Sequence, residues 1–177
     1  YKKAIKIEPD KPLWYSNRAI SYKNLKDYIN ALADYTKAIE LEPNEPFRYS
    51  YRGDCYEEME DYDNALVDYS KAIELEPDNP QWYNSRGLFY YAQEKYDLAK
   101  KNFETALSVD PEYVYAINNI GLIYEEQKRY DLAIKQYTKA IELETSNVEA
   151  YYRNRGDVYK KLKDFINALA DYTKAIE

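Results

Sequence analysis

The sequence predicts an all-α protein built as a solenoid of repeated, antiparallel helix pairs. The first observation is a period, because the related phrases YTKAIELEP, YSKAIELEP, FETALSVDP and YTKAIELET begin 34 residues apart, at Tyr35, Tyr69, Phe103 and Tyr137. A fixed period of this length is typical of a repeat solenoid. The second observation is a helical pattern of apolar residues that occurs twice in each period. The third is a proline near most of the period boundaries.

The period divides the chain into a leading fragment and five repeats. We expect residues 1–11 to hold the second helix of a preceding repeat, and the five repeats to span residues 12–45, 46–79, 80–113, 114–148 and 149–177, the last one truncated. The chain is then a single array and needs no division into separate globular domains. Positions below are counted from the first residue of each repeat.

Residues 46–79 show the pattern of one repeat. Tyr49, Gly53 and Tyr56, at positions 4, 8 and 11, are spaced by four and three residues and so share one helical face. After the polar stretch EMED, a second such set occurs at positions 17, 20, 24 and 27. Pro77 ends this pattern because proline lacks the N–H that a helix needs. The short turn between the two helices predicts antiparallel packing.

Small residues recur where the two helices are expected to meet. All four glycines occupy position 8: Gly53, Gly87, Gly121 and Gly156. Glycine inside a helix costs about 1 kcal/mol relative to alanine, so we expect position 8 to be the point of closest approach. No glycine is left for a phosphate-binding loop. Eighteen of the 23 tyrosines lie at positions 4, 11, 17 or 24, and we expect them in the core.

This pattern resembles the tetratricopeptide repeat family. The match consists of an aromatic or apolar residue at position 4, Gly or Ala at 8, Tyr at 11, Tyr or Phe at 17 and 24, Ala at 20 and 27, and Pro at 32. It covers almost the whole chain, with Ile117 at position 4 and Thr145 at position 32 as departures. The resemblance implies a right-handed superhelix whose first helices line a concave groove.

Position 7, usually aliphatic in that family, is arginine in four repeats. These arginines are Arg18, Arg52, Arg86 and Arg155, and position 23 is then Asp34, Asp68, Asn102 and Asp171. Where position 7 is Ile120, position 23 is Gln136. We infer an Arg–Asp pair that joins the two helices of a repeat. Such a pair specifies register more than it adds stability, and we interpret it as structural rather than ligand-binding.

Composition excludes several classes of function. Lys and Arg number 25 against 32 Asp and Glu, a net charge of −7 with a pI near 4.9. We therefore predict binding to neither nucleic acid nor anionic membranes. Histidine is absent and cysteine occurs once, so no Ser-His or Cys-His pair and no His-containing zinc site can form. We predict no enzymatic activity, cofactor or metal. With no targeting or membrane-spanning segment recognisable, we expect a cytoplasmic location.

One face of the first helix of each repeat, generated by positions 2, 5, 6, 9, 12 and 13, is rich in asparagine and aromatic residues. Asparagine can pair with the main chain of an extended peptide, and tyrosine or leucine can hold apolar side chains. This ladder resembles the peptide-holding surface of the O-linked N-acetylglucosamine transferases. The alternative is a merely solvated face. The candidate peptide-binding residues are Asn17, Tyr51, Asn84, Ser85, Leu88, Tyr91, Tyr115, Asn118, Asn119, Leu122, Arg153 and Asn154.

The family's carboxylate clamp, which holds chaperone C-termini, is not expected here. It needs lysine and arginine at defined positions of three consecutive repeats, and no three repeats of this chain supply those cations. The predicted function is a non-catalytic scaffold that binds a peptide or helix of a partner protein. Two alternatives stay open: a substrate-recruiting arm of a larger enzyme, and a structural oligomerisation module.

Two segments of the chain are almost identical. KDYINALADYTKAIE, residues 26–40, and KDFINALADYTKAIE, residues 163–177, differ at one residue. This identity suggests recent duplication, and we expect the chain to be part of a longer array. Solenoid ends that lack a polar capping element expose apolar surface. Head-to-tail self-association through such ends is a further expectation.

Overall fold

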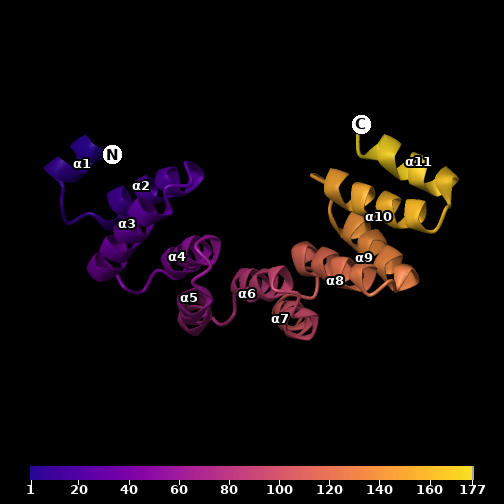
Figure 1. Ribbon diagram of the computed structural model, residues 1–177, viewed down its shortest axis with the longest axis horizontal. Coiled ribbons are helices and arrows are strands. Elements are labelled where there is room, and N and C mark those ends of the chain that lie inside the picture. Colours follow the sequence, from indigo (N-terminus) through magenta and orange to yellow (C-terminus); the bar gives the residue numbers. More distant parts are fainter. Residues whose placement is uncertain (177) are drawn as a thin grey trace. The chain divides into compact units, whose positions relative to one another are not determined.

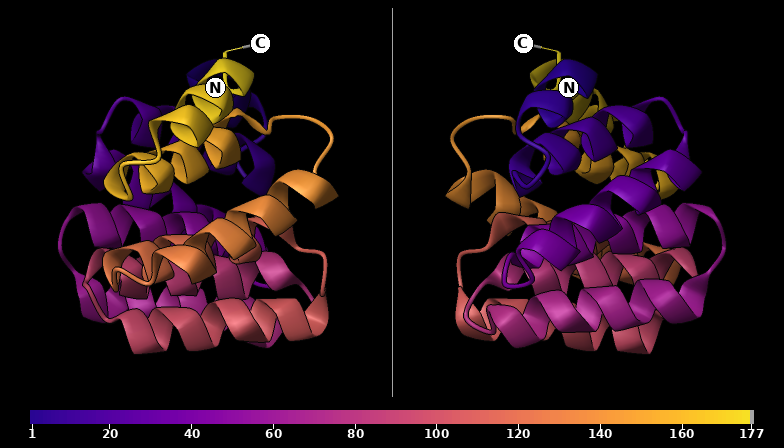
Figure 2. Two further views of the ribbon diagram at one scale, coloured as in Figure 1. Left: turned by 90° about the vertical axis from the view of Figure 1, so that its right-hand side faces the viewer. Right: turned by 90° about the vertical axis from the view of Figure 1, so that its left-hand side faces the viewer.

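The computed structural model describes residues 1–176, and the helices of this part of the chain are shown in Figure 1. No strand occurs within that range, and the views in Figure 2 accordingly contain coiled ribbons and connecting loops alone. The chain forms two compact units, residues 1–86 and residues 87–177, whose boundary lies within one helix. Each unit is described separately.

The first unit contains two complete helix pairs. Its helices are α1 (Lys2–Ile7), α2 (Pro12–Asn24), α3 (Tyr28–Leu41), α4 (Pro46–Glu58), α5 (Tyr62–Leu75) and the first part of α6 (Pro80–Ala92). In Figure 1, α2 packs with α3 and α4 packs with α5, and α4 also packs on α3. Below, α2, α4, α6, α8 and α10 are called A helices, and α3, α5, α7, α9 and α11 are called B helices.

The second unit repeats the same arrangement. It holds the remainder of α6 and then α7 (Tyr96–Val109), α8 (Val114–Glu126), α9 (Tyr130–Leu143), α10 (Glu149–Lys161) and α11 (Phe165–Lys174). The pairs are α8 with α9 and α10 with α11, and α10 also packs on α9. The prediction of an all-α fold made of helix pairs is therefore confirmed.

The turn inside each pair reverses the chain through a left-handed residue that is not glycine. This residue, at position 15, has φ between 57° and 62° in all five pairs: Lys26, Glu60, Glu94, Lys128 and Lys163. In the first turn Lys26 N–H donates to the carbonyl of Lys23, and Asp27 N–H donates to that of Tyr22, each at 2.9 Å. This is the Schellman arrangement, which satisfies carbonyls at the end of a helix.

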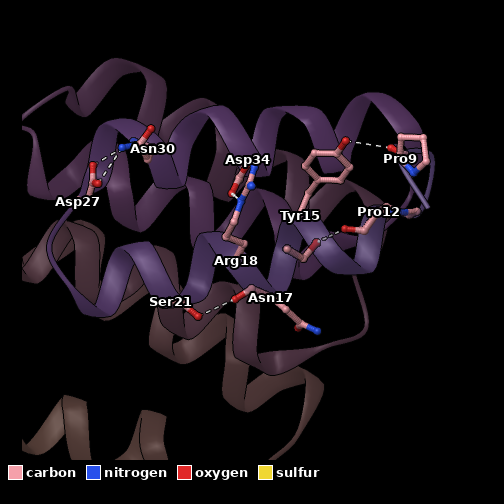
Figure 3. A network of polar contacts seen from close by, with 10 residues as sticks. Pro9, Pro12, Tyr15, Asn17, Arg18, Ser21, Asp27, Asn30 and Asp34 are labelled. Atoms are coloured by element: carbon pink, nitrogen blue, oxygen red, sulfur yellow. Dashed lines mark hydrogen bonds and ion pairs between the residues drawn. The ribbon is translucent and has the colours of Figure 1, made fainter. Parts of the chain in front are cut away.

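Three of the B helices begin with an aspartate cap. Asp27 Oδ1 accepts the main-chain N–H of Asn30 at 3.3 Å, and its Oδ2 accepts the Asn30 side-chain amide at 2.8 Å (Figure 3). Asp61 and Asp164 form the same pair of bonds. In α7 and α9 the equivalent residues are Lys95 and Arg129, which form no side-chain cap.

The core of each pair is the contact between position 8 of the A helix and the aromatic ring at position 24 of the B helix. Tyr35 and Tyr137 are fully buried, and Tyr69 is 2% exposed. A Cβ atom added to Gly121 would lie 2.6 Å from the Tyr137 ring, well inside van der Waals contact. The prediction that position 8 is the point of closest approach is confirmed.

The expectation that all eighteen patterned tyrosines are core residues was wrong. Of these eighteen, only Tyr35, Tyr49, Tyr69 and Tyr137 are buried, and Tyr1 and Tyr62 are 55% and 42% exposed. For the half-buried Tyr15 and Tyr22 the reason is Arg18 at position 7, which lies beside both rings and keeps a charged group next to them. The Arg18 guanidinium lies 5.9 Å from the centres of both the Tyr15 and the Tyr22 rings.

The predicted Arg–Asp pairs form in three repeats. Arg18 donates through Nε and Nη2 to both carboxylate oxygens of Asp34, at 2.6 and 2.7 Å (Figure 3). The pairs of residues 52 with 68 and 155 with 171 have the same two-bond geometry. The hydrogen bond to Asp34 raises the pKa of Arg18 above its ordinary value. The Arg18 guanidinium of this pair is therefore held in its charged form.

These arginines also join consecutive repeats, which the sequence did not predict. Arg52 Nη1 donates to Thr36 Oγ1 at 3.1 Å, and Arg155 Nη1 donates to Thr138 Oγ1 at 2.8 Å. Arg86 makes the same bond to a serine hydroxyl at 3.2 Å. In each case the hydroxyl stands at position 25 of the preceding repeat. The guanidinium groups of Arg52 and Arg155 thus each join their own B helix to the B helix of the preceding repeat.

Candidate functional site

The candidate peptide-binding face is the set of A-helix positions 2, 5, 6, 9, 12 and 13, here called the A face. Four of its predicted residues lie in the first unit. Asn17 is half-buried, and its side chain points away from α3 (Figure 3). Tyr51 and Ser85 are half-buried, whereas Asn84 is only 8% exposed. The A face is therefore less open at Asn84 than the sequence suggested.

A polar cluster surrounds Tyr51 in the first unit. Its ring is packed edge-on against Tyr35, with centroids 6.3 Å apart. Lys23 Nζ lies 5.2 Å from the centre of the Tyr51 ring and forms an ion pair with Asp54. Tyr69 donates its hydroxyl to Asp54 at 2.8 Å. Lys23 and Asp54 were missed as site residues, although positions 12 and 9 lie on the A face.

A glutamate completes this cluster. Glu57 Oε2 lies 2.7 Å from the same Tyr69 hydroxyl, whose single proton is shared between Asp54 and Glu57. Burial raises the pKa of Glu57, although the bond from Tyr69 acts in the opposite direction. The carboxylates of the cluster are thus held in place by protein donors before any ligand arrives.

The second unit contains an asparagine ladder that joins α8 to α10. Asn154 Nδ2 donates to Asn118 Oδ1 at 3.0 Å, and Asn118 Nδ2 donates to Asn119 Oδ1 at 3.3 Å. Asn119 is 7% exposed, whereas Asn118 and Asn154 are half-buried. A side-chain amide offers two donors and an acceptor with two lone pairs. The ladder therefore orients the Asn118 and Asn154 amides without using their full hydrogen-bonding capacity.

The other predicted residues of the second unit differ in exposure. Tyr115 is 59% exposed, Leu88 is 42% exposed, and Arg153 is exposed. Leu122 is half-buried and packs on the core cluster around Tyr137. Tyr91 is half-buried with its ring centre 5.5 Å from that of Tyr96, and burial raises the pKa of Tyr91 to about 12. Tyr115 and Leu88 are the apolar side chains most open to a ligand.

Two lysines of the A face, Lys23 and Lys161, are paired with carboxylates. Lys161 Nζ donates to Glu125 Oε1 at 2.8 Å, while the hydroxyl of Tyr137 donates to Glu125 Oε2 at the same distance. Lys23 is paired with Asp54 as described above. These two ammonium groups are therefore engaged by carboxylates of the protein itself.

Arg48 is a buried residue whose role the sequence did not reveal. It is 4% exposed and donates to the Glu42 carbonyl at 2.7 Å, to the Glu42 carboxylate at 2.6 Å and to Ser16 Oγ at 3.1 Å. A similar bond at the same position joins Trp14 to Glu8, at 2.9 Å. The sequence feature that could have indicated these contacts is the glutamate at position 31, Glu42 in the first repeat, which recurs in other repeats. These contacts join one repeat to the next and leave Arg48 no role on the A face.

The lone cysteine is a core residue. Cys55 is fully buried, and burial raises the pKa of its thiol to about 11. A thiol with such a pKa is protonated at neutral pH and is a poor nucleophile. Among residues 1–176, no group of three or more cysteine or acidic side chains is placed to hold a metal ion. None of the helices in that range is both long enough and apolar enough to cross a bilayer.

Family comparison matches nearly the whole chain. Models of the tetratricopeptide repeat match residues 12–45, 47–79, 78–146 and 149–177. A search of curated protein sequences gives no match.

Solved structures share the fold at low sequence identity. MamA from Desulfovibrio magneticus RS-1 is 22% identical with a TM-score of 0.70, and the alignment covers 94% of each chain. YrrB, described as a TPR protein with an unusual peptide-binding site, is 24% identical with a TM-score of 0.61 over 99% of this chain and 90% of its own. A chain of the Cut9–Hcn1 complex has a TM-score of 0.83 at 16% identity, with 99% of this chain and 35% of that chain covered. These likenesses establish the fold.

Proposed function

The chain belongs to the tetratricopeptide repeat family, and on that premise we propose that it is a non-catalytic scaffold that binds a segment of a partner protein along its A face. The family is typically non-catalytic and its structures include a peptide-binding member, which supports a protein partner. The contacts that carry the proposal lie on α8 and α10 of the second unit.

The observation that carries the proposal is the bond between Asn118 and Asn154. This bond fixes two amide groups on neighbouring A helices, so that a ligand does not have to order them. An extended peptide presents a main-chain N–H and carbonyl at each residue, and amide side chains pair with both. Such pairing is independent of the ligand's sequence.

In addition to these main-chain bonds, exposed apolar side chains of the second unit would contact apolar side chains of the ligand. Tyr115 and Leu88 are 59% and 42% exposed. A tyrosine ring covers a large apolar area at little cost in rotamer entropy, so Tyr115 is suited to contact an apolar side chain of the ligand. We propose that the ligand is an internal extended segment with apolar side chains, held by its main chain and not by a terminal carboxylate.

Peptide selection tests this proposal. A random peptide library is selected on the full chain, and the dissociation constants of the selected peptides are measured by titration calorimetry. We expect Asn118→Ala and Asn154→Ala each to weaken binding by about tenfold, as for the loss of a buried hydrogen bond to a ligand. Circular dichroism checks that both variants remain helical.

Asn44→Ala is the matched control, because Asn44 is an exposed asparagine in the loop between α3 and α4. It should leave the dissociation constant within about twofold, a change well below one hydrogen bond in free energy. If the three variants bind the selected peptides equally, the A face of the second unit is not the binding surface.

A further inference from the structure

On the A face of the first unit, a ring and a carboxylate hold an ammonium group of the protein itself. Lys23 of α2 places Nζ 5.2 Å from the centre of the Tyr51 ring and forms an ion pair with Asp54. Proteins commonly recognise ammonium and guanidinium groups by an aromatic face together with a carboxylate. Tyr51 stands at position 6, where the other four repeats have asparagine or serine. The sequence therefore provides such a ring in one repeat, on α4.

Three carboxylates surround this ammonium group. Burial is the main cause that raises the pKa of Glu57, and the charges of Asp54 and Glu58 act in the same direction, so the three acidic groups lie near one another. The side chains of Lys23 and Asp54 are 29% and 31% exposed. A ligand can therefore reach the ion pair from solvent, and the excess of negative charge attracts a cation. Below, Lys23, Tyr51, Asp54, Glu57 and Glu58 are called the Tyr51 cluster.

A buried hydroxyl with unused hydrogen-bonding capacity lies beside this cluster. The Tyr35 hydroxyl is fully buried and has no hydrogen-bond partner among residues 1–176, and its ring packs edge-on against that of Tyr51. In three other repeats the hydroxyl at position 24 meets a carboxylate at position 9 or 12 of its own A helix. In the repeat of Tyr35, position 12 is Lys23. The Tyr35 hydroxyl is thus directed at the part of the A face where Lys23 stands.

We propose that the Tyr51 cluster binds an arginine side chain of the partner protein, whose guanidinium takes the place of the Lys23 ammonium on the Tyr51 ring. This inference rests on the proposed function, because it names a side chain of the segment that the A face binds. A planar guanidinium stacks on the ring, donates two bonds to Asp54 and keeps donors for Glu57 and for the Tyr35 oxygen. The partly exposed ion pair of Lys23 opposes this exchange only weakly, and its long side chain can extend into solvent.

An NMR titration of the full chain with two probe peptides tests this proposal. The probes are short alanine peptides with blocked ends that carry one central arginine, or citrulline, which has nearly the same shape and no charge. Added salt keeps the ionic strength constant. We expect the main-chain amide resonances of Tyr51 and Asp54 to shift saturably with the arginine peptide, and the citrulline peptide to bind about tenfold more weakly because it lacks the charge-assisted bonds. Equal binding of the two peptides, or no saturable shift with the arginine peptide, would overturn the proposal.

A pair of matched variants separates the cluster from the net charge of the protein. Asp54→Asn should weaken binding of the arginine peptide by about tenfold, because the guanidinium loses its charged acceptor. Asp63→Asn is the control, since Asp63 is an exposed aspartate of α5, outside the A face, and the variant changes the net charge equally. It should leave the dissociation constant within about twofold. Equal effects of the two variants would show attraction by net charge alone and would overturn the assignment.

Two further variants test the exchange of one cation for another. Lys23→Met should tighten binding of the arginine peptide by about threefold, because the ligand no longer has to replace a weak ion pair. Tyr35→Phe should weaken it by about threefold, because the guanidinium loses a neutral acceptor. Weaker binding by Lys23→Met would make Lys23 part of the binding machinery and would contradict the exchange.

Asn118→Ala distinguishes a failure of this inference from a failure of the proposed function. Asn118 belongs to the second unit, so the variant should leave the preference for arginine over citrulline unchanged. If that preference is missing while Asn118→Ala still weakens the peptides selected from the library, the inference is wrong and the proposed function stands. If the preference is present while Asn118→Ala has no effect on the selected peptides, the Tyr51 cluster stands and the asparagine ladder is not a binding site.

Discussion

At the scale of the residue, the tyrosines at position 24 bury the same ring but place their hydroxyls in different surroundings. The Tyr137 hydroxyl donates to Glu125 at 2.8 Å, and that of Tyr69 lies within hydrogen-bonding distance of two carboxylates, Asp54 and Glu57. The Tyr35 hydroxyl is buried and has no hydrogen-bond partner among residues 1–176. In its repeat, positions 9 and 12 are Ile20 and Lys23 instead of acids. An unsatisfied buried hydroxyl costs about 1–3 kcal/mol.

Tyr35→Phe should therefore stabilise the protein, because it removes the unsatisfied hydroxyl and keeps the ring. We expect the free energy of unfolding in urea to rise by about 1 kcal/mol. Tyr137→Phe is the matched control and should lower it by about 1–2 kcal/mol, since Glu125, whose side chain is 12% exposed, loses one of its two donors and keeps only Lys161. Shifts of the two midpoints in the same direction would contradict this account of the hydroxyls.

The glycines at position 8 differ in how tightly they face the ring. An added Cβ would lie 2.6 Å from the Tyr137 ring at Gly121 but 3.2 Å from the Tyr69 ring at Gly53. Alanine gains about 1 kcal/mol of helix propensity, while overpacking costs about 1–3 kcal/mol. Gly121→Ala should lower the thermal midpoint, and Gly53→Ala should leave it unchanged or raise it. The opposite order would refute the packing argument.

At the scale of the element, the pairs of helices were predictable and their ends were not. Prolines such as Pro46 and Pro80 and the apolar periodicity predicted two helices per repeat. The turn residues, including Lys26 and Glu60, gave no such signal, since charged residues rarely adopt positive φ. Here the carbonyls of the Schellman turn and the packing of the pair impose it. A local preference is thus overridden by tertiary packing.

The B helices α7 and α9 begin without a side-chain cap. Lys95 stands where Asp61 caps α5, and it makes no side-chain cap. Lys95→Asp should raise the free energy of unfolding by about 1 kcal/mol, because it supplies an acceptor for a main-chain N–H and a favourable charge at the helix N-terminus. Asp61→Ala should lower it by about the same amount. Urea denaturation monitored by circular dichroism measures both, and a neutral Lys95→Asp would contradict the capping argument.

Part of the candidate site was predictable for the same reason as the fold. Helical periodicity placed Asn118 and Asn154 on one face of neighbouring A helices, and the structure brings them to 3.0 Å. Periodicity does not reveal how deeply a side chain on that face is buried, so it did not anticipate that Asn84 and Asn119 are 8% and 7% exposed. Nor did it anticipate the pairing of Lys23 with Asp54, which joins residues 31 positions apart.

At the scale of the whole molecule, two different sets of side chains join consecutive repeats. Arg52 and Arg155 at position 7 each bond to a hydroxyl of the preceding repeat. Position 7 lies outside the A face, which carries the asparagine ladder between α8 and α10. The division of the chain into repeats at residues 12, 46, 80, 114 and 149 stays a prediction of the sequence pattern.

The central claim is that the A face of the second unit holds the main chain of a peptide. Its most direct test is an NMR titration that follows the side-chain amide resonances of the asparagines as a selected peptide is added. The account predicts that the resonances of Asn118 and Asn154 shift together and saturate with the peptide, while that of Asn44 stays in place. Saturable binding that leaves Asn118 and Asn154 unshifted would contradict it.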